Sequence, residues 1–107
     1  MKIYISGPMT GVKDYVRRFQ EAEEYLRDMY GSVDIINPAH IVSELPRDTP
    51  WNRSMHITLN ALDGCDAIFL LNGWENSKGA QIEKLFAEGS NMQILYEARS
   101  PIQKPPA

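Results

Sequence analysis

The chain has 107 residues, of which 43% are apolar and 23% charged, with a net charge of −3. These values predict one globular domain, over residues 1–98, followed by a flexible tail over 99–107. The weak negative charge, without long runs of one sign, argues against a nucleic-acid polymer as partner. A single cysteine, Cys65, excludes an intrachain disulfide. We find no signal-peptide pattern or apolar run of about 20 residues, so we expect a cytoplasmic protein without a membrane segment.

The first third of the chain predicts a strand followed by a helix. Residues 2–6 are β-branched and aromatic and lead into Gly7-Pro8, as at the end of a strand. Asp14 is placed to cap a helix over 15–30, which Gly31 would end. The helical spacing predicts a buried face made of Tyr15, Phe19, Ala22, Leu26 and Met29.

The middle of the chain predicts a second strand, a loop and a second helix. Residues 33–36 form the strand, which Asn37-Pro38 ends. Residues 39–50 contain two prolines and mixed polarity, so we expect an irregular loop that can include a helical turn. The second helix spans 51–63, with its apolar face formed by Met55, Leu59 and Leu62.

The last third predicts a buried strand, a helix and a final strand. Residues 66–71 are almost continuously apolar, which is typical of a central parallel strand covered on both faces. Ser77 is placed to cap the next helix, whose expected apolar residues are Ile82, Leu85 and Phe86. Residues 92–96 form the final strand.

Alternating strands and helices predict an α/β fold with a flavodoxin-like or Rossmann-like doubly wound parallel sheet. We expect about four strands in the order 2-1-3-4. Ligands bind such sheets beyond the carboxyl ends of the strands, where the strand order reverses. That point lies between the first and third strands, so the loops that follow residues 6 and 71 should meet there.

The loop after the first strand carries groups that suit a phosphate. Glycine allows a close backbone approach, and hydroxyl groups donate hydrogen bonds. The candidate residues are Ser6, Gly7, Met9 and Thr10. The loop has neither a dinucleotide-binding GxGxxG pattern nor a P-loop lysine, so an ordinary turn without a ligand is an equal alternative.

The loop after the third strand is more specific. Ser77 stands at a helix N-terminus, where backbone N–H groups and the helix dipole favour an anion. Gly79 lies one turn before Glu83 on the same face, so a ligand can approach that carboxylate. The alternative is a solvated glutamate on an exposed helix surface.

Two aromatic residues have open roles. Tyr4 lies near the carboxyl end of the first strand, where it is either a core residue or a hydrogen-bond donor that orients Glu83. Trp74 follows Gly73 and either stacks on a nucleobase or covers the core. Neither His40 nor His56 is expected to be catalytic.

Several segments together resemble the nucleoside 2-deoxyribosyltransferase superfamily, and especially its small, often phage-encoded members. The resemblance runs in order over about residues 1–96. The matching segments are residues 4–11, 37–39, 65–68, 73–74 and 77–83.

The resemblance implies a mechanism. Glu83 would attack the anomeric carbon of a nucleoside or nucleotide and expel the base, leaving a covalent glycosyl-enzyme ester. Tyr4 would orient Glu83. Ser77 matches the branch that hydrolyses nucleoside 5′-monophosphates, in which hydroxyls at this position and in the first loop, here Thr10, bind the phosphate. Trp74, or the loop of Asn37 and Pro38, would flank the base.

One position departs from the superfamily pattern. Members usually carry an aspartate that helps protonate the leaving base, and this chain has Thr58 there. A threonine hydroxyl has no pKa suited to general acid catalysis, an effect typically worth about 10²–10⁴-fold in rate. Asp63 and His56 are weak candidates to replace it.

The leading hypothesis is therefore an N-glycosidase acting on a (deoxy)nucleoside 5′-monophosphate through Glu83. The first alternative is a nucleotide-binding module with weak or no activity, and the second is a nucleoside 2-deoxyribosyltransferase that exchanges bases. The carboxylate mechanism requires no metal or organic cofactor. Relatives self-associate, and a four-stranded sheet leaves edges to cover, so we expect a homodimer or higher homo-oligomer.

Overall fold

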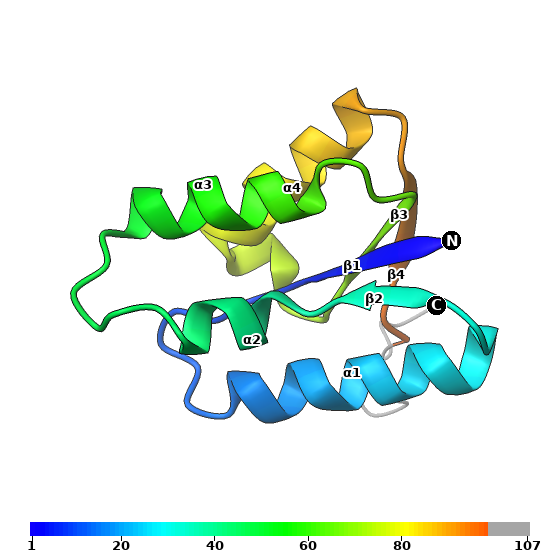
Figure 1. Ribbon diagram of the computed structural model, residues 1–107, viewed down its shortest axis with the longest axis horizontal. Coiled ribbons are helices and arrows are strands. Elements are labelled where there is room, and N and C mark those ends of the chain that lie inside the picture. Colours follow the sequence, from blue (N-terminus) through cyan, green and yellow to red (C-terminus); the bar gives the residue numbers. More distant parts are fainter. Residues whose placement is uncertain (99–107) are drawn as a thin grey trace, which may run out of the picture.

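A parallel sheet forms the centre of the computed structural model, which describes residues 1–98 (Figure 1). Within these residues the sheet has four strands in the order β2-β1-β3-β4, which confirms the predicted α/β fold and strand order. The expected tail, residues 99–107, lies outside the described residues. The elements in chain order are β1 (Lys2–Ser6), α1 (Tyr15–Tyr30), β2 (Asp34–Ile36), α2 (Pro38–Ser43), α3 (Trp51–Leu62), β3 (Ala67–Leu70), the 3₁₀ turn η1 (Trp74–Asn76), α4 (Lys78–Gly89) and β4 (Gln93–Tyr96).

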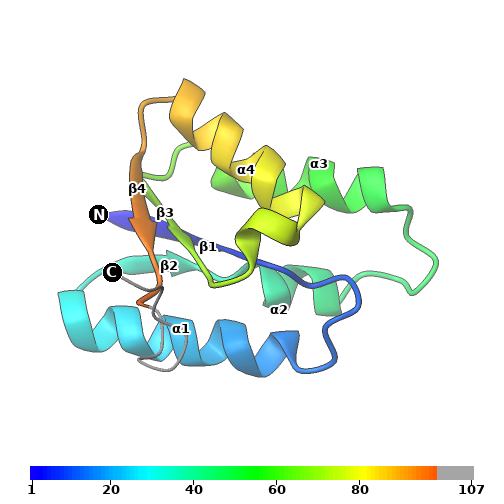
Figure 2. The same ribbon diagram turned by 180° about the vertical axis from the view of Figure 1, so that it is seen from behind.

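Helices cover both faces of the sheet. Figure 1 and, from behind, Figure 2 show α1 on one side and α3 with α4 on the other. The first face is buried through Ile3, Ile5, Phe19, Ala22, Leu26, Ala67, Phe69 and Leu71. The second face is buried through Tyr4, Leu62, Cys65, Ile68, Leu70 and Ala87. Because both faces of β1 and β3 are covered, these strands need apolar side chains at nearly every position.

Helix α1 has the predicted bounds, but two details of the prediction are wrong. Met29 is 57% exposed rather than buried. A 16-residue helix is about 24 Å long, whereas the five-residue strand β1 spans about 17 Å, so the last turn of α1 extends past the sheet. Asp14 makes no side-chain cap hydrogen bond and instead pairs with Arg17 at 2.6 Å. Gly31 has a φ of 70° at the helix end, as predicted.

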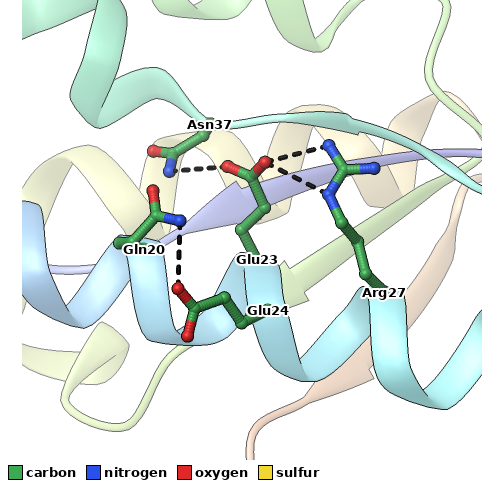
Figure 3. A network of polar contacts seen from close by, with 5 residues as sticks. All are labelled: Gln20, Glu23, Glu24, Arg27 and Asn37. Atoms are coloured by element: carbon green, nitrogen blue, oxygen red, sulfur yellow. Dashed lines mark hydrogen bonds and ion pairs between the residues drawn. The ribbon is translucent and has the colours of Figure 1, made fainter.

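The predicted loop over 39–50 begins with α2, a helix of six residues, so the helical turn that the sequence analysis allowed there starts at Pro38 and is longer than one turn. Asn37 Oδ1 accepts a hydrogen bond of 3.0 Å from the backbone N–H of Ala39, and Pro38 occupies the first helical position. Asn37 Nδ2 also donates to Glu23 Oε1 on α1 at 3.1 Å, and the other Glu23 oxygen accepts from Arg27 (Figure 3). The Asn37 side chain therefore links the start of α2 to α1 by hydrogen bonds.

Helix α4 approaches the sheet through small residues rather than large ones. Its buried positions are Ala80, Glu83 and Ala87. Leu85, which the spacing placed on the apolar face, is 67% exposed, so that part of the prediction is wrong. The small side chains let the backbone of α4 pack close to β1 and β3, which brings Glu83 against the sheet.

Candidate active site

Glu83 is a carboxylate in the interior of the fold. It is only 6% exposed and lies between Ala80 and Ala87 on the face of α4 that meets the sheet. A glutamate is rarely buried to this extent unless other groups satisfy its charge. The neighbours of Glu83 therefore decide what this side chain can do.

Two hydroxyl groups of β1 bind the Glu83 carboxylate, one on each oxygen. Tyr4 Oη donates to Oε2 and Ser6 Oγ donates to Oε1, both at 2.7 Å. Tyr4 and Ser6 are two residues apart on a strand, so their side chains leave the same face of the sheet. Both residues are fully buried. The two hydroxyl groups of β1 thus fix the orientation of the carboxylate.

Burial and hydrogen bonding act on Glu83 in opposite directions. Burial raises the pKa of Glu83 above its ordinary value, while hydrogen bonding from Ser6, Tyr4 and Thr58 limits that rise. The Thr58 hydroxyl also donates to the carbonyl oxygen of Met55 at 3.3 Å, and a hydroxyl hydrogen can rotate between such acceptors. Burial, together with the nearby Glu83 charge, raises the pKa of Tyr4 well above its ordinary value. Tyr4 is therefore a neutral donor to the carboxylate.

Glu83 reaches solvent through a cavity of about 140 Å³. The cavity lies beyond the carboxyl ends of β1 and β3, at the place that the topology predicts for a ligand. Its lining residues are Gly7, Met9, Thr10, Val42, Trp51, Ser54, Met55, Thr58, Ser77, Gly79, Ala80 and Glu83.

A second, shallower hollow of about 530 Å³ adjoins this cavity. It includes the N-terminus of α4, where Ser77 Oγ accepts a hydrogen bond of 3.2 Å from the Ala80 N–H. The Ser77 O–H can still donate to a ligand, because a hydroxyl both accepts and donates. Thr10 and Gly79 line both spaces, and Lys78 adds a positive charge to the second. This hollow suits an anionic group.

Most of the candidates from the sequence lie around the cavity, although in two layers. The residues that line it are Gly7, Met9, Thr10, Thr58, Ser77, Gly79 and Glu83. Tyr4 and Ser6 lie beneath Glu83 and do not line the cavity. Ser6 was expected to contact a phosphate, but its hydroxyl is fully buried and bound to Glu83.

The residues expected to flank a base do not line the cavity. Asn37 and Pro38 are buried at the start of α2, where Asn37 binds Glu23 and caps the helix. Trp74 packs against Tyr96, with ring centroids 6.2 Å apart, and lies under the Lys84 ammonium group. For Trp74, the structure favours the alternative that it covers the core.

The sequence analysis named Thr58 on α3 but missed four other residues of α2 and α3 that line the cavity. Val42 lies on α2, and Trp51, Ser54 and Met55 lie on the first turns of α3. Trp51 is 42% exposed, and the Lys78 ammonium lies 4.7 Å from its ring centroid. The available signal was the spacing of residues 51, 54, 55 and 58, which share one face of a helix.

The cavity contains few ionisable groups. Glu83 is the one titratable side chain among the described residues that line it. His56 and Asp63, the weak candidates to replace an aspartate at Thr58, are exposed and line a different groove, along α3 and α4. Over residues 1–98 we find no cluster of His, Cys, Asp and Glu that could hold a metal ion, and no helix able to span a membrane.

Comparison with known proteins supports the fold. A 2-desoxiribosyltransferase from Leishmania mexicana has a similar structure, with a TM-score of 0.64 and 20% sequence identity. The match covers 89% of this chain and 62% of that chain. It confirms, at the level of the fold, the predicted resemblance to deoxyribosyltransferases. No curated protein matches the chain significantly in sequence. Residues 1–96 match the model of a domain family of unknown function, and the chain belongs to that family, DUF4406.

Proposed function

We propose that the protein is an N-glycosidase that cleaves the bond between base and sugar in a (deoxy)nucleoside 5′-monophosphate. The observation that carries this proposal is the Glu83 carboxylate, which is 6% exposed, held by two hydroxyl groups at 2.7 Å, and open to a cavity. A surface glutamate needs no such support. A carboxylate that must attack a sugar carbon needs such hydrogen bonds, because its reactive oxygen has to be held in one position.

In this mechanism Glu83 acts as the nucleophile. One carboxylate oxygen attacks the anomeric carbon, the bond from that carbon to the base nitrogen breaks, and a glycosyl ester forms. Water then attacks the same carbon and releases the sugar phosphate and the free carboxylate. Tyr4 and Ser6 position Glu83 throughout, and we assign Ser6 to this role rather than to the phosphate.

The phosphate would occupy the hollow at the start of α4. Hydroxyl groups of Thr10 and Ser77 and the charge of Lys78 suit an anion there, together with the backbone N–H groups of the first helical turn. Gly79 lines both this hollow and the cavity, and its lack of a side chain leaves room between the hollow and Glu83. Trp51, rather than Trp74, is the aromatic side chain placed to contact the nucleoside.

The direct test is release of free base from a panel of ribo- and deoxyribonucleoside 5′-monophosphates, measured by chromatography. We expect release by the wild type and by Glu88→Gln, a control on the same helix whose carboxylate is exposed and paired with Lys84. Glu83→Gln should release none while keeping the same circular dichroism spectrum. Normal turnover by a folded Glu83→Gln protein would overturn the proposal. A second free base added to the assay tests transfer, the activity in the name of the structural neighbour.

A binding module without turnover is the second candidate. It is favoured by the absence of any titratable group other than Glu83 among the described residues lining the cavity. In that case isothermal titration shows saturable binding of a nucleotide, while no base appears after long incubation. Binding should then survive Glu83→Gln and weaken with Ser77→Ala.

We also propose that the protein self-associates. The edge strands β2 and β4 each leave one side unpaired among the described residues. Light scattering coupled to gel filtration measures the molar mass directly, and a monomer at all concentrations would contradict the proposal.

A further inference from the structure

Among residues 1–98, the lining of the cavity offers a nucleophile but no second group able to protonate a leaving base. Apart from Glu83, its lining consists of glycine, alanine, valine, methionine, serine, threonine and tryptophan side chains. Tyr4 lies beneath Glu83, is fully buried, and has a pKa raised well above its ordinary value by burial and by Glu83, so it is a poor acid. Thr58 is equally unsuited, since a hydroxyl of this kind does not ionise near neutral pH.

The charge of the base decides how strongly the missing acid lowers the rate of base release. An uncharged purine or pyrimidine leaves the sugar as an anion unless an acid protonates it, and such help is typically worth about 10²–10⁴-fold in rate. A base that already carries a fixed positive charge on its ring leaves as a neutral molecule. It therefore needs no acid.

We infer that the preferred substrates are N-glycosides whose base is already cationic, such as N-alkylated purinium or pyridinium nucleotides. The inference rests on the proposed function of Glu83 as nucleophile and names the substrate class for that site. A carboxylate oxygen of Glu83 forms a bond to C1′, and the bond from C1′ to the ring nitrogen breaks. Its electron pair stays on the nitrogen and cancels the positive charge. Water then displaces the carboxylate from C1′ and releases one proton to solvent.

A second observation on the cavity agrees with a cationic base. Trp51 lines the cavity and offers an aromatic ring to a ligand there. An aromatic face attracts positive charge through its quadrupole. Glu83, which lines the same cavity, adds a negative charge when ionised. The aromatic ring and the carboxylate in this lining therefore favour a cationic base over a neutral one.

The experiment compares N7-methylguanosine 5′-monophosphate with guanosine 5′-monophosphate, a pair that differs by one methyl group and its charge. Both ribo and 2′-deoxy forms are used at about pH 6, where the methylated base is cationic, and release in Glu83→Gln is subtracted as background. We expect Glu83-dependent release from the methylated nucleotide to be at least about 100-fold faster. Nicotinamide mononucleotide, a pyridinium nucleotide, should also be cleaved.

The variant Thr58→Asp tests the cause of the expected difference in rate. That cause is either the missing acid or the greater intrinsic reactivity of a cationic base. The new carboxyl group can protonate an uncharged base, so this variant should raise release from guanosine 5′-monophosphate at least about tenfold. The rate ratio between the two substrates should fall accordingly. Thr58→Asn, which has a similar shape and no ionisable proton, is the matched control and should leave the ratio high. Any effect of these changes on Glu83 itself applies to both substrates and cancels in the ratio.

The outcomes distinguish this inference from the proposed function. If the wild type cleaves both nucleotides at similar, Glu83-dependent rates, the inference is wrong and the glycosidase proposal stands. If no cationic or neutral nucleotide releases base above the Glu83→Gln background, both are wrong. If the Thr58 variants do not fold, the wild-type pH profile with nicotinamide mononucleotide decides. A rate that rises with ionisation of Glu83 and then stays level supports the inference, and a fall at alkaline pH, as for a required acid, contradicts it.

Discussion

Tyr4 Oη donates a hydrogen bond of 2.7 Å to Glu83 Oε2, although the two residues are 79 positions apart in the chain. The bond joins the first strand to the last described helix across the buried face of the sheet. Because both side chains are almost inaccessible to solvent, this contact cannot be replaced easily by water. The orientation of the carboxylate is therefore a property of the whole fold.

Removing that donor should weaken catalysis without disrupting the core. Tyr4→Phe keeps the ring and loses only the hydroxyl, which helps to lower the pKa of Glu83. The pKa of Glu83 should rise further, so the ascending limb of the pH–rate profile should move to higher pH. We expect a fall in kcat of about 10- to 100-fold, as for a lost hydrogen bond to a charged group. Tyr25→Phe is the control, because Tyr25 lies on α1, is 44% exposed and stacks on Phe69 rather than contacting Glu83.

Glu83→Gln should make the protein more stable at neutral pH. Burial raises the pKa of Glu83 above its unfolded value, so the folded protein holds this proton more tightly. The resulting stability is complete below the unfolded pKa and is lost as pH rises through the folded pKa. Each pKa unit corresponds to about 1.4 kcal/mol. Thermal unfolding should show a higher Tm for Glu83→Gln at neutral pH and a smaller difference in acid, and an equal gain at every pH would contradict this account.

Ser77→Ala should affect nucleotides more than nucleosides. It removes the helix cap, at a cost of about 1 kcal/mol in unfolding free energy, together with the hydroxyl that faces the second hollow. We expect KM for a 5′-monophosphate to rise about 10- to 100-fold relative to KM for the matching nucleoside. Ser54→Ala is the comparison, since Ser54 lines the cavity but not the second hollow, and it should leave that ratio unchanged.

The two glycines near Glu83 should respond differently to alanine. A Cβ at Gly7 would lie 2.8 Å from Leu71 Cβ, in a tightly packed part of the core, so Gly7→Ala should lower the unfolding free energy by about 1–3 kcal/mol. A Cβ at Gly79 would meet the flexible Met55 side chain at 3.2 Å. Gly79→Ala should therefore preserve stability better and instead raise KM by narrowing the cavity. Denaturant unfolding and steady-state kinetics on both variants check this, and equal stability losses would contradict it.

The local pattern of the sequence carried most of the information on the sheet. Continuous apolar runs mark strands covered on both faces, and glycine at position 31 marks a helix end, because these signals depend on short-range geometry. Helical spacing wrongly predicted that Met29 and Leu85 are buried. Helical spacing shows which residues share a face, whereas the length of the neighbouring sheet and the closeness of packing decide whether that face is covered.

Local sequence patterns were enough to place Glu83 one turn into a helix, beside the loop that follows the first strand. Tertiary structure decided the rest of the site. It bound the Ser6 hydroxyl to Glu83, placed Asn37 and Trp74 in the packing of the fold, and brought Trp51 to the cavity. These outcomes depend on how α2 and α3 lie over the end of the sheet. That arrangement is set by contacts between residues far apart in the chain, which no short sequence pattern records.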